Sequence, residues 1–175
     1  YCATCDGPLF KEQEIAVVGG GDAAVDEALT LSEFASRVTV IHRRDQLRAT
    51  RVLQERALNN PKISFLWNTV VEEIEGDDRV GELQLFDKNA GNRSTLNVSG
   101  IFVAIGRRPL TDYLRDVVSL DEEGHIITNE RMETSMPGVL AAGDVRHNSA
   151  RQAITAAGDG ATAAIAAQRF LWERS

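Results

Sequence analysis

Apolar residues in the first part of the chain come in short blocks of two kinds. Ile15–Val18 and Val38–Ile41 are compact runs rich in β-branched residues, which is typical of buried strands. Between them, Ala24, Ala28 and Leu31 recur at helical spacing. The order strand, helix, strand predicts a βαβ unit of a parallel sheet with a right-handed crossover.

The pattern continues with a second helix and then loses this alternation. Residues 48–58 are predicted to form a helix, and residues 63–67 a further strand. From residue 70 to residue 98, short alternating stretches separated by glycine- and asparagine-containing turns predict an antiparallel meander. The apolar run at 101–105 is expected to be a fully buried strand.

A linker near residue 107 is expected to divide the chain into two domains, 1–107 and 108–175. In the second domain we predict a strand pair around residues 125–128, an apolar strand at 139–142 and a buried, alanine-rich helix at 153–171. This remainder is too small to form an independent nucleotide-binding domain. The fold class is therefore α/β, with a Rossmann-like first domain whose parallel sheet is accompanied by the antiparallel meander.

Composition narrows the class of protein. Of the 175 residues, 43% are hydrophobic and 26% are charged, as in folded rather than disordered proteins. The formal net charge of −7 argues against nucleic-acid binding, which needs a basic face. The longest stretch without a charged residue, Ser94–Gly106, is too short to cross a bilayer. We therefore expect neither a nucleic acid nor a membrane as a partner.

The N-terminus and the cysteine content bear on origin and location. The chain begins at Tyr1 rather than methionine, so we expect a piece of a longer protein, and we expect no signal peptide. Cys2 and Cys5 are the only cysteines, which do not make the disulfide framework of a small secreted protein. The expected location is cytoplasmic.

A glycine-rich motif lies between the first strand and the first helix. Gly19, Gly21 and Ala24 match the dinucleotide-binding fingerprint. Gly20 lies inside the motif, and Asp22 is expected to cap the helix. Such glycines permit a tight turn and let a pyrophosphate approach the helix N-terminus. A turn without a ligand is the alternative, which the βαβ context disfavours.

Basic residues follow the second strand, where an NAD-binding fold carries an acidic residue for the adenosine ribose. Here the chain has His42, Arg43 and Arg44, with Arg48 one turn further. Arg43 lies 24 residues after Gly19, close to the usual spacing of the ribose-binding residue, and guanidinium groups suit a 2′-phosphate. A solvated basic turn is the alternative, but the position favours NADPH over NADH.

The two cysteines form a Cys-x-x-Cys pair, Cys2 and Cys5, whose spacing allows a reversible redox disulfide. Asp6 adjoins the pair and could donate or accept a proton. Half of a zinc site is one alternative, but there is no other cysteine and the three histidines are scattered, so we expect no metal. Two ordinary buried cysteines are the second alternative.

A weaker signal lies in the second domain. Gly143 and Asp144 end the apolar run, and Arg151, Gln152 and Ala153 begin the last helix. An aspartate at a strand end can bind a hydroxyl chain, and a helix N-terminus can stabilise negative charge on a ring such as reduced flavin. Taken alone, an aspartate at this place is more often a turn or cap residue.

In this order, the motifs resemble bacterial-type, low-molecular-weight thioredoxin reductases, which are pyridine nucleotide-disulfide oxidoreductases. The resemblance spans all 175 residues and rests on Cys2–Gly7, Gly19–Ala24, His42–Arg44 with Arg48, Ile105–Pro109, Gly143–Val145 and Arg151–Ala153. It implies an NADPH-binding domain inserted in a split FAD-binding domain, whose C-terminal part this chain would hold and whose N-terminal part it would lack. Leu110 departs from the family pattern, in which a small polar residue is usual.

The resemblance also implies roles for individual residues. Cys5 would lie next to the flavin, Cys2 would attack the partner disulfide, and Asp6 would be the general acid. The residues implied at the NADPH site are Gly19, Gly20, Gly21, Asp22, Ala23 and Ala24 for the pyrophosphate turn, His42, Arg43, Arg44 and Arg48 for the 2′-phosphate region, and Ile105 and Gly106. The residues implied at the FAD site are Gly143, Asp144 for the ribityl chain, Arg151, and Gln152 and Ala153 for the pyrimidine edge.

The implied reaction passes electrons from NADPH through FAD to the cysteine pair and on to thioredoxin or a thioredoxin-like protein, in a homodimer. Because Cys5 lies 14 residues before Gly19, the disulfide and the nicotinamide site are expected on one domain and the flavin on the other. A domain rotation with hinges near residues 8–11 and 106–109 would alternate them. The alternatives are an NADPH-binding module without turnover and a related reductase serving another redox partner.

Overall fold

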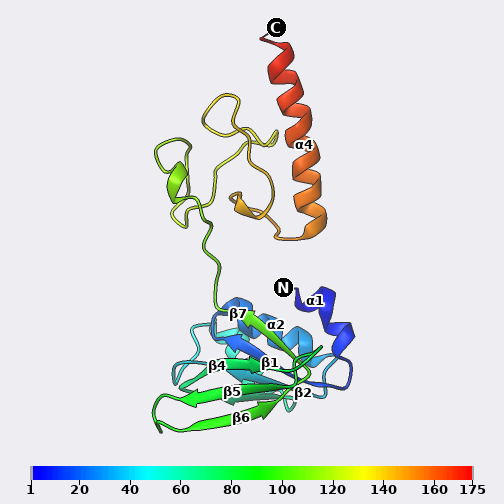
Figure 1. Ribbon diagram of the computed structural model, residues 1–175, viewed down its shortest axis with the longest axis vertical. Helices are drawn as coiled ribbons and strands as arrows, with labels where there is room; N and C mark the ends of the chain where they lie inside the picture. The colour runs from blue at the N-terminus through cyan, green and yellow to red at the C-terminus, as the bar shows by residue number, and fades with distance from the viewer. Residues whose placement is uncertain (1, 175) are drawn as a thin grey trace. The chain divides into compact units, whose positions relative to one another are not determined.

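The computed structural model describes residues 2–174 and divides the chain into two compact units. Unit 1 ends at Gly106 and unit 2 begins at Arg107, one residue before the domain boundary expected from the sequence. Among the described residues, all of the strands lie in unit 1, and unit 2 consists mainly of loops and one long helix, α4 (Figure 1).

A four-stranded parallel sheet forms the centre of unit 1 (Figure 1). Its strands, in spatial order, are β3 (Ile63–Leu66), β2 (Arg37–Ile41), β1 (Glu14–Gly19) and β7 (Gly100–Ala104). All neighbouring pairs run parallel, so the carboxyl ends of the strands lie at one edge. The strand order reverses beside β1, which is where open α/β sheets bind their ligands.

Helix α2 (Asp22–Ser32) packs on this sheet through the face predicted to be apolar, and Ala24, Ala28 and Leu31 are completely buried. The predicted capping role of Asp22 is wrong. Gly21 is the N-cap residue, and the Asp22 carboxylate accepts a hydrogen bond from the backbone of another segment instead.

Helix α3 (Arg51–Leu58) begins three residues later than the predicted helix of 48–58. The backbone N–H groups of Arg48 and Ala49 both donate to the carbonyl oxygen of Gly20, at 2.6 and 3.1 Å. These tertiary hydrogen bonds tie the segment to the glycine turn.

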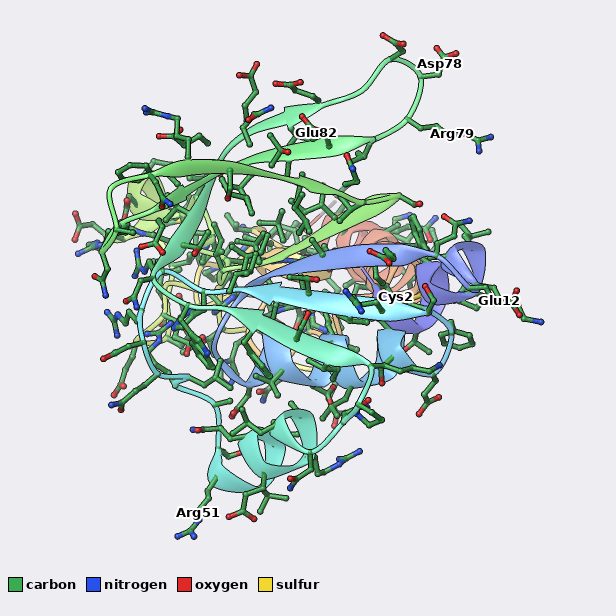
Figure 2. The ribbon with its side chains drawn as sticks, turned by 90° about the horizontal axis from the view of Figure 1, so that it is seen from below. Cys2, Glu12, Arg51, Asp78, Arg79 and Glu82 are labelled. Carbon is green, nitrogen blue, oxygen red and sulfur yellow. A yellow bond between two sulfur atoms is a disulfide. The ribbon has the colours of Figure 1, made fainter. Side chains whose placement is uncertain are left out.

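The predicted meander is confirmed as a separate three-stranded antiparallel sheet, in the order β4 (Thr69–Glu75), β5 (Glu82–Asp87) and β6 (Arg93–Asn97) (Figure 1). Leu83 and Leu85 of β5 are buried in one cluster with Ala16 and Ile41 of the parallel sheet. One face of the meander therefore packs on the parallel sheet. The turn that connects the end of β4 to the start of β5 carries exposed charged side chains (Figure 2).

Strand β7 is only partly buried, contrary to the prediction of a fully buried strand. Gly100 and Phe102 are buried, whereas Ile101 and Val103 are half-buried. Ile105, just beyond the strand, is 68% exposed. Alternate side chains of a strand face opposite sides, and the side that carries Ile101 and Val103 borders an open cleft.

The Cys-x-x-Cys segment folds as a short helix, α1 (Ala3–Asp6), followed by a 3-10 helix, η1 (Gly7–Phe10). Ala3 is buried in the same cluster as residues of α2. The disulfide-bearing segment is therefore packed on unit 1.

Contacts at Gly7 and Phe10 attach residues 8–11, where the sequence predicts a hinge, to unit 1. A Cβ added to Gly7 would come within 2.9 Å of the Phe34 ring. Phe10 packs edge-on against Phe102, with ring centroids 5.5 Å apart. Residues 8–11 therefore lie inside unit 1, and no division of the chain falls there.

Before its last helix, unit 2 contains two 3-10 helices, η2 (Asp112–Leu114) and η3 (Gly143–Val145). The strands predicted around 125–128 and at 139–142 do not form among the described residues. Ile126 and Leu140 make only isolated bridges, so neither segment has the continuous ladder that a strand requires.

Helix α4 (Ala153–Trp172) confirms the long helix predicted from the alanine-rich tail, but the prediction that it is buried is wrong. Ala166 is its only buried residue among the described positions. Ile154, Ile165 and Leu171 are 80%, 54% and 66% exposed, because the loops of unit 2 cover only a narrow stripe of the helix. In the described part of the chain, no helix is long and apolar enough to span a membrane.

Candidate functional site

A cleft of about 650 Å³ opens at the carboxyl ends of β1, β2 and β7 in unit 1. The glycine turn after β1, the segment after β2 and the residues that follow β7 line it, together with β4. Ten residues predicted from the sequence meet in this lining: Gly19, Gly20, Gly21, Asp22, Ala23, His42, Arg43, Arg48, Ile105 and Gly106.

The glycine turn brings backbone to the cleft surface. Gly19 has a φ of +152°, and a Cβ added there would come within 2.6 Å of the Ala24 Cβ. Ala24 is completely buried beneath the turn and lies outside the lining, so it allows the close packing of helix and strand. At Gly21, no other atom lies within 4 Å of an added Cβ, and the backbone is therefore open to a ligand.

The His42 ring packs against the second glycine of the turn. A Cβ added to Gly20 would lie within 2.7 Å of His42 Nε2, and this nitrogen is 3.0 Å from the Gln46 carbonyl oxygen. Burial lowers the pKa of His42, and the neighbouring arginines lower it further, against the opposing effect of the Gln46 carbonyl. The His42 ring, which donates from Nε2 to this carbonyl oxygen, therefore supports the turn.

The structure brings two of the three predicted arginines into the cleft lining. Arg43 and Arg48 line it, whereas Arg44 does not. The Arg44 carbonyl accepts a hydrogen bond from Asn68 N–H, which ties this residue to the start of the meander.

Strand β4 supplies cleft residues that the sequence reasoning missed. Thr69–Ile74 line the cleft together with the glycine turn. Glu72 forms two hydrogen bonds with Arg93, at 2.7 and 3.1 Å, and this contact lowers the pKa of Glu72. The short connection between β3 and β4 was the available signal, because it returns the chain at the carboxyl edge of the sheet.

Cys2 and Cys5 are joined by a disulfide, with their Cα atoms 5.2 Å apart. Cys2 is the N-cap residue of α1, and its sulfur accepts a hydrogen bond of 3.2 Å from the Cys5 N–H. Cys5 is exposed, Cys2 is half-buried, and Asp6 ends the helix. A backbone N–H directed at a sulfur favours its thiolate form once the disulfide is reduced.

In unit 2, the predicted residues lie around η3 and the start of α4. Gly143 has a φ of +79°, and its N–H donates to Asp159 Oδ2 at 3.1 Å. Asp144 is exposed and lies 3.6 Å from Arg107. Gln152 is the N-cap residue of α4 and Ala153 its first residue.

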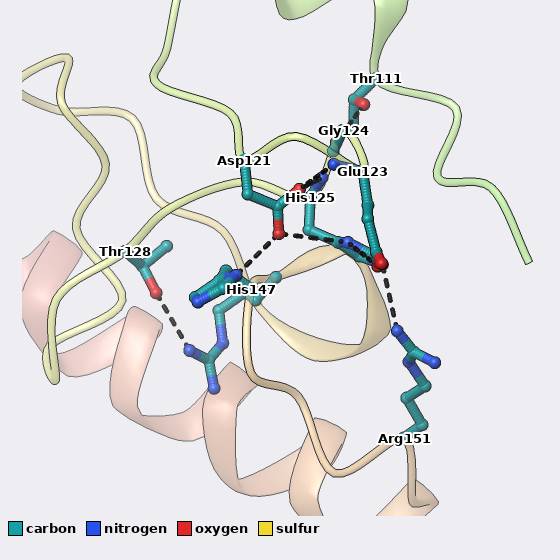
Figure 3. Close-up of polar contacts among 9 residues, drawn as sticks. Thr111, Asp121, Glu123, Gly124, His125, Thr128, His147 and Arg151 are labelled. Atoms are coloured by element: carbon teal, nitrogen blue, oxygen red, sulfur yellow. Dashed lines mark hydrogen bonds and ion pairs between the residues drawn. The ribbon is translucent and has the colours of Figure 1, made fainter. Parts of the chain in front are cut away.

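A polar cluster precedes α4, although the sequence reasoning treated its histidines as scattered (Figure 3). Asp121 accepts a hydrogen bond of 2.7 Å from His147 and lies 3.4 Å from His125. The His147 contact lowers the pKa of Asp121 to about 2. Arg151 extends the cluster, with its guanidinium 3.3 Å from His125 Nε2. Among the residues described by the structure, no group of histidine, cysteine and acidic side chains could hold a metal ion.

Comparison with known families gives one match over most of the chain. Residues 1–160 match the family model of pyridine nucleotide-disulphide oxidoreductases. The matched range contains the cysteine pair, the glycine turn, the arginines and the residues around η3.

Individual relatives agree with the family match. The chain is 49% identical to a thioredoxin reductase of Bacillus subtilis and 51% identical to one of Mycolicibacterium smegmatis, in both cases over 99% of its own length. It covers 55% and 56% of those proteins. The crystal structure of thioredoxin reductase from Streptococcus pyogenes matches with a TM-score of 0.90 and 46% identity, over 99% of this chain and 57% of that one. The chain thus spans about half the length of these relatives.

Proposed function

Because this chain belongs to the pyridine nucleotide-disulphide oxidoreductase family, we propose that it serves thioredoxin-disulfide reduction. Electrons would pass from NADPH through FAD to the Cys2–Cys5 disulfide and on to thioredoxin or a thioredoxin-like protein. One observation carries the proposal: unit 1 holds a dinucleotide-type cleft and a Cys-x-x-Cys disulfide together. Neither feature alone distinguishes a reductase from a binding module.

The position of two arginines in the cleft supports NADPH as the electron donor. The segment after β2 places Arg43 and Arg48 at the lining, where an acidic residue would suit the ribose of NADH. Two guanidinium groups can hold a 2′-phosphate by charge-assisted hydrogen bonds. Glu72 and Glu73 also line the cleft, and Glu72 forms an ion pair with Arg93. The open backbone at Gly21 leaves room for the pyrophosphate at the N-terminus of α2.

The geometry of the cysteine pair supports different roles for its two sulfurs. The Cys5 N–H stabilises negative charge on Cys2, so Cys2 is the thiol that attacks the partner disulfide. Cys5, exposed on unit 1, is the thiol that meets the flavin. Asp6 follows Cys5 directly in the sequence, and we assign it as the general acid for the thiolate that leaves.

Unit 2 supports a contribution to an FAD site. The Asp144 carboxylate is exposed on the η3 turn and suits the ribityl hydroxyl groups, while Gln152 and Ala153 at the start of α4 suit the pyrimidine edge of the ring. Gly143 and Arg151 complete this set. FAD, when bound, supplies the step between a two-electron hydride donor and a disulfide.

We assign residues 1–107 to the NADPH-binding domain and residues 108–175 to the C-terminal part of the FAD-binding domain. The disulfide and the cleft lie on the same unit, so one flavin must meet them in turn. A rotation about residues 106–109 would alternate them, and Gly106, with a φ of +99°, suits such a hinge. The whole enzyme would act as a cytoplasmic homodimer.

The proposal is tested by anaerobic visible spectroscopy of the chain after incubation with FAD and removal of unbound flavin. We expect NADPH to bind with preference over NADH. If a flavin band is present, we expect NADPH to bleach it and oxidised thioredoxin to restore it. A colourless protein that binds NADPH would support the second candidate, an NADPH-binding module. A chain that binds neither nucleotide would contradict both.

A further inference from the structure

The segment that carries Arg48 is attached to the glycine turn on both sides of this residue. The Arg48 N–H donates to the Gly20 carbonyl oxygen at 2.6 Å. Two residues later, the Thr50 N–H donates to Oδ1 of Asp22 at 2.6 Å. The backbone of Arg48 is therefore fixed by the same turn that forms the floor of the cleft.

The presence of Asp22 needs an explanation, because its charge opposes the proposed ligand. Asp22 lines a cleft that would bind a pyrophosphate and a 2′-phosphate, and a carboxylate there repels both. Its position in the first turn of α2 is favourable to the helix, but an uncharged residue could begin the helix as well. The hydrogen bond from Thr50 needs an acceptor oxygen at this position, which the Asp22 carboxylate provides.

We propose that Asp22 is a positioning residue for nucleotide selectivity, which acts by holding the 48–50 segment so that Arg48 meets the 2′-phosphate. This inference rests on the proposed function and extends it to a residue outside the phosphate-binding arginines. The long arginine side chain gains most from a fixed backbone, because less conformational freedom is then lost on binding. NADH lacks the 2′-phosphate, so its affinity does not depend on this fixation.

Two substitutions of the same residue separate its charge from its hydrogen bond. Asp22→Ala and Asp22→Asn both remove the negative charge, but only asparagine retains an oxygen that can accept from Thr50 N–H. Affinities for NADPH and NADH are measured by nicotinamide fluorescence titration of the full chain, after circular dichroism has confirmed folding. We expect the preference for NADPH over NADH to be about fivefold lower in Asp22→Ala than in Asp22→Asn, since one hydrogen bond is lost. The NADH affinities of the two variants should agree.

Two further variants test the route through Arg48. Asp26→Ala removes a charge one turn further along α2, outside the cleft lining, and should keep the wild-type preference. In an Arg48→Ala background, Asp22→Ala should lower the preference no further, because the residue it positions is gone. An equal effect of Asp22→Ala with and without Arg48 would overturn the inference.

The outcomes distinguish this inference from the proposed function. A wild-type chain that binds NADPH and NADH equally would overturn the NADPH assignment itself. A wild-type chain that prefers NADPH, with the same preference in Asp22→Ala and Asp22→Asn, would overturn only the positioning role of Asp22.

Discussion

Arg146 and Asp159 form a largely buried ion pair that fastens the η3 turn to helix α4. Arg146 Nε lies 2.8 Å from Asp159 Oδ2, and the same oxygen accepts the Gly143 N–H. The guanidinium also donates to Thr128, so it links three segments of unit 2. The turn that carries Asp144 is held in this way, together with the isolated bridge between Ile126 and Arg146.

Removing one partner of this pair should destabilise unit 2. Asp159→Ala leaves the Arg146 charge without its carboxylate and the Gly143 N–H without its acceptor. We expect the melting temperature to fall by several degrees in differential scanning calorimetry. Asp116→Ala, which removes an exposed carboxylate of the same unit, is the matched control. Equal melting temperatures for both variants would contradict a structural role of the pair.

Acid should weaken the loop cluster around Asp121. Folding lowers the pKa of Asp121 from its ordinary value of 3.8 to about 2, chiefly through the His147 hydrogen bond. A carboxyl whose pKa is lowered stabilises the fold above its unfolded pKa and loses this contribution as the pH falls towards its folded pKa. We therefore expect the free energy of unfolding to decrease between about pH 4 and pH 2, and Asp121→Asn to reduce this slope. Urea unfolding across that range measures it, and an unchanged slope would refute the assignment.

Two adjacent glycines should respond differently to alanine. Gly20→Ala forces a methyl group into the His42 ring, which we expect to cost about 1–3 kcal/mol of stability. Gly21→Ala meets no neighbouring atom and should keep the stability of the fold, but its methyl group enters the cleft where a pyrophosphate would approach. Thermal melts and NADPH titrations of the pair separate the two effects. A Gly21→Ala variant with full NADPH affinity would place the pyrophosphate elsewhere.

We expect the contribution of each arginine to NADPH affinity to depend on whether it lines the cleft. Arg43→Ala and Arg48→Ala each remove a guanidinium from the lining, and we expect each to lower NADPH affinity by about tenfold with a smaller change for NADH. Arg44→Ala, outside the lining, should have a smaller effect, so that the double variant Arg43→Ala with Arg44→Ala resembles Arg43→Ala alone. Isothermal titration with both nucleotides measures this. An unchanged preference for NADPH over NADH in the two lining variants would contradict the assignment of these arginines to the 2′-phosphate.

Substitution of one cysteine should separate the two halves of the reaction. In the complete enzyme, Cys2→Ser should leave flavin reduction by NADPH intact and abolish thioredoxin reduction, because the attacking thiol is lost. Stopped-flow absorbance follows the flavin, and a coupled assay follows thioredoxin. Thr4→Ser, which changes an exposed residue between the cysteines, is the control. Normal turnover of thioredoxin by Cys2→Ser would refute the role of Cys2.

Local sequence patterns were sufficient for the elements whose formation depends on neighbouring residues. The strands β1 and β2, the helix α2 and the meander were predicted because periodicity and turn residues act within a few positions. The meeting of the glycine turn with His42, Arg43 and Arg48 followed from the same reasoning, since consecutive parallel strands bring their carboxyl ends to one edge.

Tertiary contacts determined the structural features that depend on residues far apart in the sequence. Helix α3 starts at Arg51, and two hydrogen bonds to the Gly20 carbonyl oxygen tie the segment before it to the glycine turn. Helix α4 is apolar yet exposed, because burial depends on what packs against a helix and not on its own composition. The contacts of Asp22 with Thr50 and of Asp121 with His147 span 28 and 26 residues, distances over which no sequence period carries information. The local sequence therefore identified the candidate ligand-binding residues. Only the tertiary structure determined which of these residues lie close together and which contacts hold them in place.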